Sequence, residues 1–234
     1  MSRDQQKHNA ALAALDFVDD NMIIGLGSGS TAEILIDLIG ERVAEGLHIA
    51  GIPTSERTRR CAERAGIDII PVEHADRVDL TIDGADEVDP NFRLMKGGGG
   101  CLLREKIVAH ASDVMVVIID ESKMVEQLGA FPLPVEVDRF GFTITAKKVF
   151  DALRDSGCKG ADVSLRERSG PRDPFVSDGG HFILDCQCKS IPDPELTARM
   201  LTSIPGVVEH GMFLDIARFI VVGGDESAEI IERQ

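Results

Sequence analysis

Residues 83–105, "DGADEVDPNFRLMKGGGGCLLRE", bring together side chains that could carry out acid–base chemistry. Asp83 and Asp86 stand close together in the chain, Lys96 runs directly into a series of glycines, and Glu105 closes the segment. Carboxylates transfer protons or hold hydroxyl groups, and a lysine beside bare backbone stabilises negative charge. The combination predicts a site that binds and deprotonates a polar substrate.

The run from Gly97 to Gly100 is difficult to explain as structure alone. Consecutive glycines are costly in conformational entropy. They also leave successive N–H groups able to form a concave anion site. Lys96 adds a full positive charge at its entrance, so we predict that this stretch stabilises an oxyanion formed during a reaction.

Glu105 belongs to a helix predicted for residues 101–111. We expect Leu103, Ile107 and Ala111 to form the core-facing side of this helix, with Glu105 on its flank. Partial desolvation on a flank suits a general base. The alternative is a surface salt bridge within "REK", which is the usual role of a helical glutamate.

Two alternatives remain open for the aspartates. "DG" is a common turn sequence, and Asp86 could cap a neighbouring segment. A divalent cation is the other possibility, because Asp79, Glu87 and Asp89 add carboxylates nearby, although no EF-hand spacing supports it.

A second glycine-rich stretch, "GLGSGSTA" at residues 25–32, follows a predicted strand and opens a predicted helix. Glycines allow close backbone approach, and a helix start offers unpaired N–H donors. Hydroxyls of Ser28, Ser30 and Thr31 flank Gly29, so the loop favours a phosphate group. The alternative is a tight turn in which Ser30 or Thr31 caps the helix.

The type of phosphate ligand can be narrowed further. "GSGSTA" fits the dinucleotide pattern G-x-G-x-x-A, but the next strand ends in "GIPTSE" without a ribose-binding acid at its tip, and the Walker lysine is absent. A phosphate monoester is therefore favoured over NAD or ATP. A base, a cation with free amides, carboxylates and a phosphate loop together favour aldose–ketose isomerisation of a sugar phosphate.

Composition excludes several other classes of function. The chain has 234 residues and a formal net charge of −15, without Trp or Tyr, which disfavours binding to nucleic acid or anionic membranes. No apolar run approaches the ~20 residues of a membrane span, and no secretory signal is evident. Five irregularly spaced cysteines predict reduced thiols in the cytoplasm, and "CQC" at 186–188 is more typical of strand residues than of a metal site.

The first half of the chain alternates predicted strands and helices. Strands are predicted at residues 22–27, 47–54, 77–83 and 114–120, and helices at 10–18, 31–44, 55–66 and 101–111. This order is typical of a doubly wound, Rossmann-like α/β fold with a mostly parallel sheet. Ligands of such sheets bind at the carboxyl ends of strands, where "GLGSGST" and "DGAD" both fall.

The pattern changes near residues 128–134, which contain two prolines. Beyond them we predict a smaller α/β domain over 128–206 with antiparallel strands, acting as a lid or an oligomer interface. Residues 1–127 and 207–234 form the predicted Rossmann-like catalytic domain. Residues 204–213 and 217–224 are expected to rejoin the first sheet as short strands.

Seven motifs together resemble the ribose-5-phosphate isomerase family, type A. They are "GLGSGSTA", "DGADEVD", "KGGGGCLLREK", "DESK", "GAFPLPVEV", "DGGHFILD" and "IPGVVEHGMF", which cover almost the whole chain. The resemblance implies interconversion of D-ribose 5-phosphate and D-ribulose 5-phosphate in the pentose phosphate pathway. It also implies no metal or organic cofactor, and a homodimer or homotetramer.

The same resemblance implies a role for each matching residue. Glu105 would be the proton-transfer base, Asp83 would open the furanose ring, and Lys96 would stabilise the developing charge with the glycine amides. The remaining residues implied to bind substrate are Ser28, Gly29, Ser30, Thr31, Gly84, Ala85, Asp86, Gly97, Gly98, Gly99 and Lys123.

Two kinds of rival function remain. A glucosamine-6-phosphate deaminase or a phosphogluconolactonase would share the architecture, but none of the six histidines lies in either glycine-rich segment, where a deaminase would be expected to have one. A non-catalytic sugar-phosphate sensor would keep the phosphate loop, but it would not require Glu105 and Lys96 together.

Overall fold

The computed structural model describes residues 2–168, 170 and 172–234. Two compact units divide the chain. The large unit comprises the residues up to Ala85 together with Arg104–Met124 and Asp215–Gln234, and the small unit comprises Asp86–Leu103 and Val125–Leu214. Each unit is described by itself below.

The large unit contains a seven-stranded sheet in the order β14-β13-β7-β4-β1-β2-β3. Every neighbouring pair is parallel except β13 with β14, which is antiparallel. The strands are β1 Ile23–Leu26, β2 Ala50–Pro53, β3 Asp68–Ile69, β4 Val78–Asp83, β7 Ser112–Asp120, β13 Phe219–Gly223 and β14 Ala228–Glu232. The prediction of a mostly parallel sheet is confirmed.

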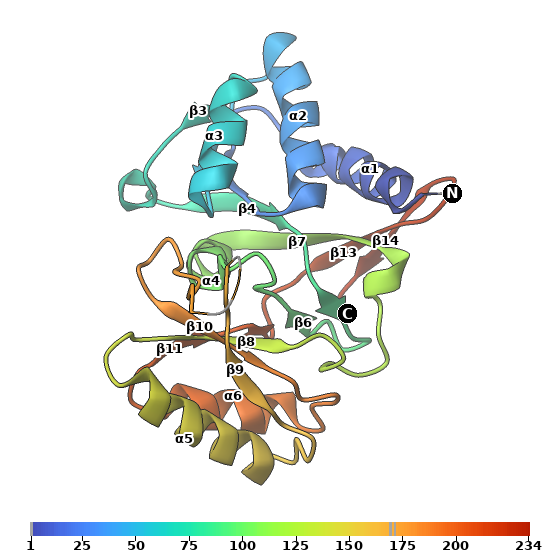
Figure 1. Cartoon of the computed structure of the whole chain (residues 1–234). Coiled ribbons are helices and arrows are strands. Elements are labelled where there is room, and N and C mark those ends of the chain that lie inside the picture. Colours follow the sequence, from blue (N-terminus) through green and yellow to red (C-terminus); the bar gives the residue numbers. More distant parts are fainter. Residues whose placement is uncertain (1, 169, 171) are drawn as a thin grey trace. The chain divides into compact units, whose positions relative to one another are not determined.

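Helices cover both faces of this sheet. Figure 1 shows α1, α2 and α3 on one face and α4 on the other. Their bounds are α1 Arg3–Ala14, α2 Ser30–Ala44, α3 Glu56–Arg64 and α4 Leu102–His110. Alternate strand residues explain the two layers: Ile24 and Leu26 belong to the core under the first three helices, whereas Ile23 packs in a cluster with Val108 of α4.

The strand order reverses beside β1. From β1 the chain passes to β2 and β3 in one direction, whereas β4, β7 and β13 extend the sheet in the other. Such a switch point opens a crevice outside the carboxyl ends of the two central strands. The segments after β1 and β4 therefore occupy the usual ligand position of a doubly wound sheet.

The small unit contains a four-stranded antiparallel sheet in the order β11-β8-β10-β9. Its strands are β8 Leu133–Val137, β9 Val163–Leu165, β10 Phe182–Cys186 and β11 Val207–His210. Helices α5 Phe142–Asp155 and α6 Pro194–Thr202 lie together on one face of this sheet (Figure 1). A second sheet, in the order β12-β6-β5, pairs Met212–Phe213, Leu94–Met95 and Glu87–Val88.

The compact units differ from the expected domains at residues 86–103, 125–127 and 207–214. Residues 86–103 belong with the small unit, because β5 and β6 pair with each other and β6 pairs with β12. The expectation that residues 204–213 rejoin the first sheet is wrong, since β11 pairs with β8 and β12 with β6. The expectation for 217–224 is confirmed, because β13 pairs with β7.

Short 3-10 helices complete the fold at η1 Leu15–Phe17, η2 Val72–His74 and η3 Glu121–Lys123. All five cysteines are free, and Cys158, Cys186 and Cys188 are buried in the small unit. Burial raises the pKa of the Cys186 thiol. Among the described residues, no helix has both the length and the apolar character required to cross a membrane.

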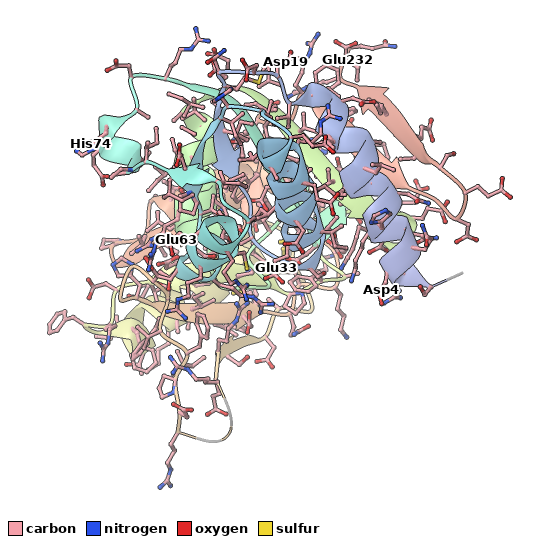
Figure 2. All side chains as sticks on the ribbon, turned by 90° about the horizontal axis from the view of Figure 1, so that it is seen from above. Asp4, Asp19, Glu33, Glu63, His74 and Glu232 are labelled. Carbon is pink, nitrogen blue, oxygen red and sulfur yellow. The ribbon has the colours of Figure 1, made fainter. Side chains whose placement is uncertain are left out.

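The strong negative charge of the chain is distributed over many elements of the large unit. Figure 2 labels Asp4 on α1, Glu33 on α2, Glu63 on α3 and Glu232 on β14. Acidic residues are thus part of separate helices and strands and do not form one continuous run. A local anion site is compatible with such a distribution.

Candidate active site

The loop after β1 is packed directly against Asp83 at the end of β4. A Cβ atom at Gly27 would overlap the Asp83 carboxylate and lie 2.5 Å from its Cα. The Gly27 N–H donates to the carbonyl of Ile82 at 3.0 Å, which continues the pairing of β1 with β4. Glycine is required here because no side chain fits between the two segments.

Helix α2 begins without a side-chain cap. Its N-cap is Gly29, with φ of 117°, and Ser30 is the first helical residue. The alternative that Ser30 or Thr31 caps the helix is therefore wrong. Both hydroxyls are left for other uses, and the first-turn N–H groups, which have no partner within a helix, are directed outward. This arrangement suits an anion at the start of α2.

Ser28 has a different role from its two neighbours. Its hydroxyl lies 2.8–2.9 Å from the hydroxyl oxygens of Thr54, Ser55 and Thr58, which form one hydrogen-bonded cluster with it. Ser55 is also the N-cap of α3, accepting from the Thr58 N–H at 3.0 Å. Ser28 thus ties the loop after β1 to the start of α3, a function that sequence reasoning missed.

Asp83 organises the loops at the carboxyl edge of the large unit's sheet. The side chain is completely buried, and its Oδ1 accepts the N–H of Ser28 at 3.0 Å and of Gly84 at 2.7 Å. One carboxylate therefore joins the loop after β1 to the turn after β4. The simple turn interpretation of "DG" does not account for the bond to Ser28.

Lys123 lies on η3, directly after β7. The Asp120 side chain caps this short helix by accepting from the Ser122 N–H at 3.0 Å. Because β7 is the parallel neighbour of β4, Lys123 follows the carboxyl end of a strand on the same edge of the sheet as Asp83.

Glu105 is more buried than the sequence indicated. The expected core-facing set is wrong: Ile107 is 50% exposed and Ala111 is exposed, whereas Leu102, Glu105 and Val108 are buried. The exposed fraction of Glu105 is only 4%. Glu105 is therefore not a surface group, and the neighbouring Arg104 donates to Glu56 at 3.2 Å.

Asp86, in the small unit, holds the second glycine-rich loop. Its Oδ2 accepts the Gly98 N–H at 2.8 Å. The capping interpretation of Asp86 is confirmed, and what it caps is the glycine run itself. The Gly98 amide is thereby engaged, so the predicted set of oxyanion donors is reduced to its neighbours Gly97 and Gly99.

Lys96 is 2% exposed and lies over the ring of Phe213, with 5.4 Å between Nζ and the ring centroid. Its backbone N–H donates to the carbonyl of Gly211 at 2.7 Å. The ammonium group is thus oriented by an aromatic face and fixed at its main chain. A buried cation of this kind is typical of sites that stabilise negative charge.

The nearby acids considered for a cation have structural partners. Glu87 accepts backbone N–H groups of Gly129 and Phe131, Asp89 accepts those of Asn91 and Arg93, and Asp79 accepts that of Ile23. Across the described part of the chain, no group of three His, Cys, Asp or Glu residues could hold a metal ion. These carboxylates secure strands and turns.

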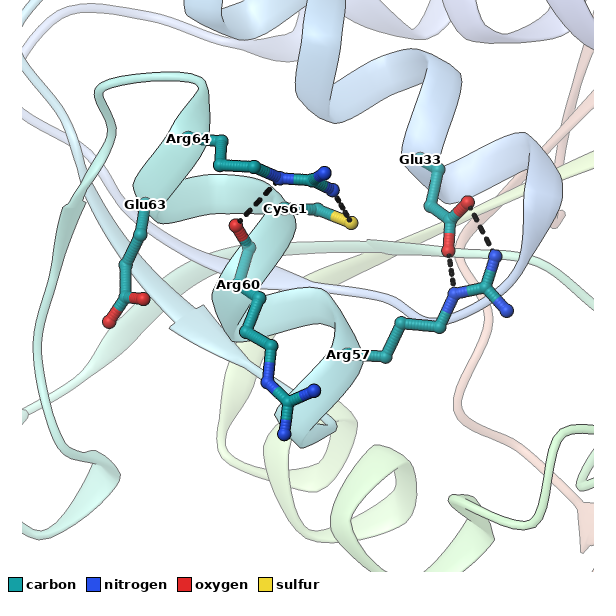
Figure 3. A pocket seen from close by; sticks show the side chains of 6 residues that line it. All are labelled: Glu33, Arg57, Arg60, Cys61, Glu63 and Arg64. Carbon is teal, nitrogen blue, oxygen red and sulfur yellow. Dashed lines mark hydrogen bonds and ion pairs between the residues drawn. The ribbon is translucent and has the colours of Figure 1, made fainter.

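A cavity of about 630 Å³ lies elsewhere in the large unit, between α2 and α3. Figure 3 shows its six lining residues, Glu33, Arg57, Arg60, Cys61, Glu63 and Arg64. Arg57 pairs with both oxygens of Glu33, and Arg64 donates to the Cys61 sulfur at 3.2 Å. No predicted site residue lines this cavity, and its three arginines outnumber its two glutamates.

Comparisons with known proteins identify the family of this chain. The family model for ribose 5-phosphate isomerase A (phosphoriboisomerase A) matches residues 50–227. The chain belongs to the ribose-5-phosphate isomerase A family.

Relatives of this family align along the whole chain. It is 55% identical over 228 residues to a ribose-5-phosphate isomerase A of Maricaulis maris, covering 97% of this chain and 98% of that protein. It is 49% identical to one of Nitrobacter hamburgensis, with both chains fully covered.

Solved isomerase structures share the fold. A D-ribose-5-phosphate isomerase in complex with phospho-erythronic acid superposes with a TM-score of 0.92 at 37% identity, covering both chains fully. The ribose 5-phosphate isomerase from Plasmodium falciparum superposes with a TM-score of 0.92 at 33% identity, and the match covers 99% of each chain.

Proposed function

We propose that this protein interconverts D-ribose 5-phosphate and D-ribulose 5-phosphate, as the names of its relatives suggest. The observation that carries the proposal is the burial of Glu105 on α4, in a chain that belongs to this family along its length. A sensor would have no reason to desolvate a carboxylate, whereas a proton-transfer base benefits from it.

We assign phosphate binding to the start of α2. The hydroxyls of Ser30 and Thr31 and the outward N–H groups of the first turn support this assignment, with Gly29 allowing close approach. Lys123 supplies a positive charge at the same edge of the sheet. Ser28 contributes by holding the loop in shape.

Asp83 is assigned the opening of the furanose ring. In this step the O1 hydroxyl loses a proton, the bond from C1 to the ring oxygen breaks, and the ring oxygen gains a proton. The buried Asp83 carboxylate is fixed by two backbone N–H groups and suits the transfer of that proton. Gly84, Ala85 and Asp86 complete the segment assigned to the sugar.

Glu105 then takes the proton from C2 of the open-chain aldose. The electron pair forms an enediolate with its charge on O1, and Glu105 returns the proton to C1 while the O2 proton passes to O1. Lys96 and the amides of Gly97 and Gly99 are assigned to the charged oxygen. The sequence of steps uses no metal or organic cofactor.

We further propose a homodimer or homotetramer working in the cytoplasm, within the pentose phosphate pathway. Phe140 and Ile144 of the small unit are 93% and 68% exposed, which supports an interface there. The five free thiols favour a reducing compartment. Light scattering of the purified protein would measure the assembly directly.

A coupled assay of ribulose 5-phosphate formation tests the reaction. We expect turnover of ribose 5-phosphate that persists in excess EDTA. Activity lost in EDTA and restored by Mg²⁺ would revive the cation interpretation of the aspartates. Tight binding of ribose 5-phosphate with no turnover would favour the sensor.

A further inference from the structure

The Arg166 guanidinium connects a distant strand to the second glycine-rich loop. Its Nη1 donates to the carbonyl oxygens of Gly97 at 2.8 Å and Gly98 at 3.2 Å. Its Nε and Nη2 donate to the two carboxylate oxygens of Asp185 at 2.9 and 2.5 Å. All of these residues belong to the small unit.

Arg166 is held in a single orientation. It follows β9 directly, and its backbone N–H donates to the carbonyl of Ile183 at 2.8 Å. Ile183 and Asp185 both belong to β10. The guanidinium also lies 5.9 Å from the ring centroid of Phe175, and that ring leaves no space for a Cβ atom at Gly100. A bidentate carboxylate and an aromatic neighbour restrict a planar guanidinium strongly.

These contacts determine where the loop's N–H groups point. In a trans peptide the C=O and N–H bonds point in opposite directions. With the Gly97 carbonyl on Arg166, the Gly98 N–H is directed away from it and reaches Asp86 at 2.8 Å. With the Gly98 carbonyl on the same guanidinium, the Gly99 N–H is likewise directed away from Arg166. Hydrogen bonding of both carbonyls to a cation also polarises the peptides and strengthens their N–H groups as donors.

We propose that Arg166 is a positioning residue for the isomerisation, orienting the Gly98 and Gly99 peptides so that the Gly99 amide is presented to the developing oxyanion. Asp185 keeps the guanidinium in place. The kinetic part of this inference rests on the proposed function, whereas the orientation of the loop does not. Neither residue is expected to touch the sugar.

The kinetic experiment compares Arg166→Ala with Arg139→Ala. Arg139 is a matched control because it also belongs to the small unit and lies over a phenylalanine ring, that of Phe182, at 5.1 Å. We expect Arg166→Ala to lower kcat by about tenfold to a hundredfold, the scale of a misplaced oxyanion donor. KM for ribose 5-phosphate should stay within about twofold, because this loop is not assigned to the phosphate. The control should leave both parameters unchanged.

Two further measurements separate positioning from general damage. Guanidinium ion added at low concentration should restore part of kcat in Arg166→Ala but none in Glu105→Gln. Arg166→Lys should not recover activity, since an ammonium group cannot hold Asp185 and two carbonyls at once. Unchanged kcat, or a loss confined to KM, would overturn the proposal.

Amide hydrogen exchange in protein labelled with ¹⁵N-glycine tests the loop without reference to catalysis. We expect the Gly98 amide to exchange faster in Arg166→Ala and in the milder Asp185→Asn, and as in wild type in Arg139→Ala. Unaltered Gly98 exchange in folded variants would refute the positioning role. If wild type does not isomerise ribose 5-phosphate but the exchange changes as expected, the proposed function fails and the structural role stands. If Arg166→Ala does not fold, Asp185→Asn decides both measurements.

Discussion

Two glycine-rich loops precede helices in this protein, and one aspartate of "DGAD" holds each of them. Asp83 accepts the Ser28 N–H of the loop before α2, and Asp86 accepts the Gly98 N–H of the loop before α4. The first loop is also tied to the start of α3, because the Ser28 hydroxyl bonds those of Ser55 and Thr58. The second depends on Arg166, which reaches it from 69 residues away in the chain.

This difference separates two kinds of anion site. The start of α2 offers donors that any helix start provides, so a permanently charged phosphate suits it. The loop after Lys96 has its donors oriented by side chains, which suits a charge that exists only during the reaction. Binding and charge stabilisation are thereby assigned to differently built structures.

The largest expected effect is on kcat when Glu105, the proposed proton-transfer base, is replaced, because neither loop transfers the proton. Glu105→Gln should lower kcat by about a hundredfold or more while ribose 5-phosphate still binds, because both loops remain intact. Steady-state kinetics and calorimetry measure the two effects. Glu63→Gln, at an exposed glutamate paired with Arg59, is the control and should behave as wild type. Turnover near the wild-type level in Glu105→Gln would remove Glu105 as the base.

A second test contrasts one glycine from each loop. Gly27→Ala should lower the free energy of unfolding by about 1–3 kcal/mol, because the new methyl group meets the Asp83 backbone. Gly99→Ala should unfold like wild type, since nothing lies within 4 Å of a Cβ atom there. Urea denaturation measures both. Equal stability of the two variants would contradict the packing described for the first loop.

The third test asks whether Asp86 acts through its bond to Gly98. Asp86→Asn keeps an oxygen acceptor, so it should retain kcat within about tenfold, whereas Asp86→Ala loses the bond and should fall further. Gly98 amide exchange should follow the same order. If Asp86→Asn and Asp86→Ala lower kcat equally and Gly98 amide exchange does not change, the charge of Asp86 matters and its bond to Gly98 does not.

The smallest effect is expected at the hydroxyl cluster that supports the first loop. Ser55→Ala removes the N-cap of α3 and should cost about 1 kcal/mol, seen as a lower midpoint of thermal unfolding. KM should rise more than kcat falls, because Ser55 also supports Ser28 of the phosphate loop. Ser203→Ala, at an exposed helix end, is a suitable control. A loss in kcat alone would argue against the link to phosphate binding.

Much of the fold followed from local patterns. Strand and helix alternation predicted the parallel sheet, and the glycines after β1 predicted a loop at its carboxyl edge that opens α2. The short strands in the second half of the chain were harder to assign to a sheet. Short apolar strands such as β11 and β12 can pair with several partners, and only their neighbours in space decided that they join the small unit.

The helix of Glu105 shows a similar limit. Apolar residues occur on more than one side of α4, so periodicity alone allowed Leu103 and Ile107 as the inner face. In the structure, Leu102 and Val108 are buried instead. Val108 packs with Ile52 and Val78 of the sheet, which fixes the side that α4 turns inward. The same orientation buries Glu105, which argues against a surface charge, and its role as the base stays a proposal.

By itself, the sequence determined the acids, the lysine and the glycines, their order, and the resemblance that names the family. These depend on residue type and local spacing. The tertiary structure decided that Ser28 joins a hydroxyl cluster, that Asp86 holds Gly98, and that Arg166 orients the glycine run. Such bonds join residues far apart in the chain, and their geometry exists only once the strands have paired.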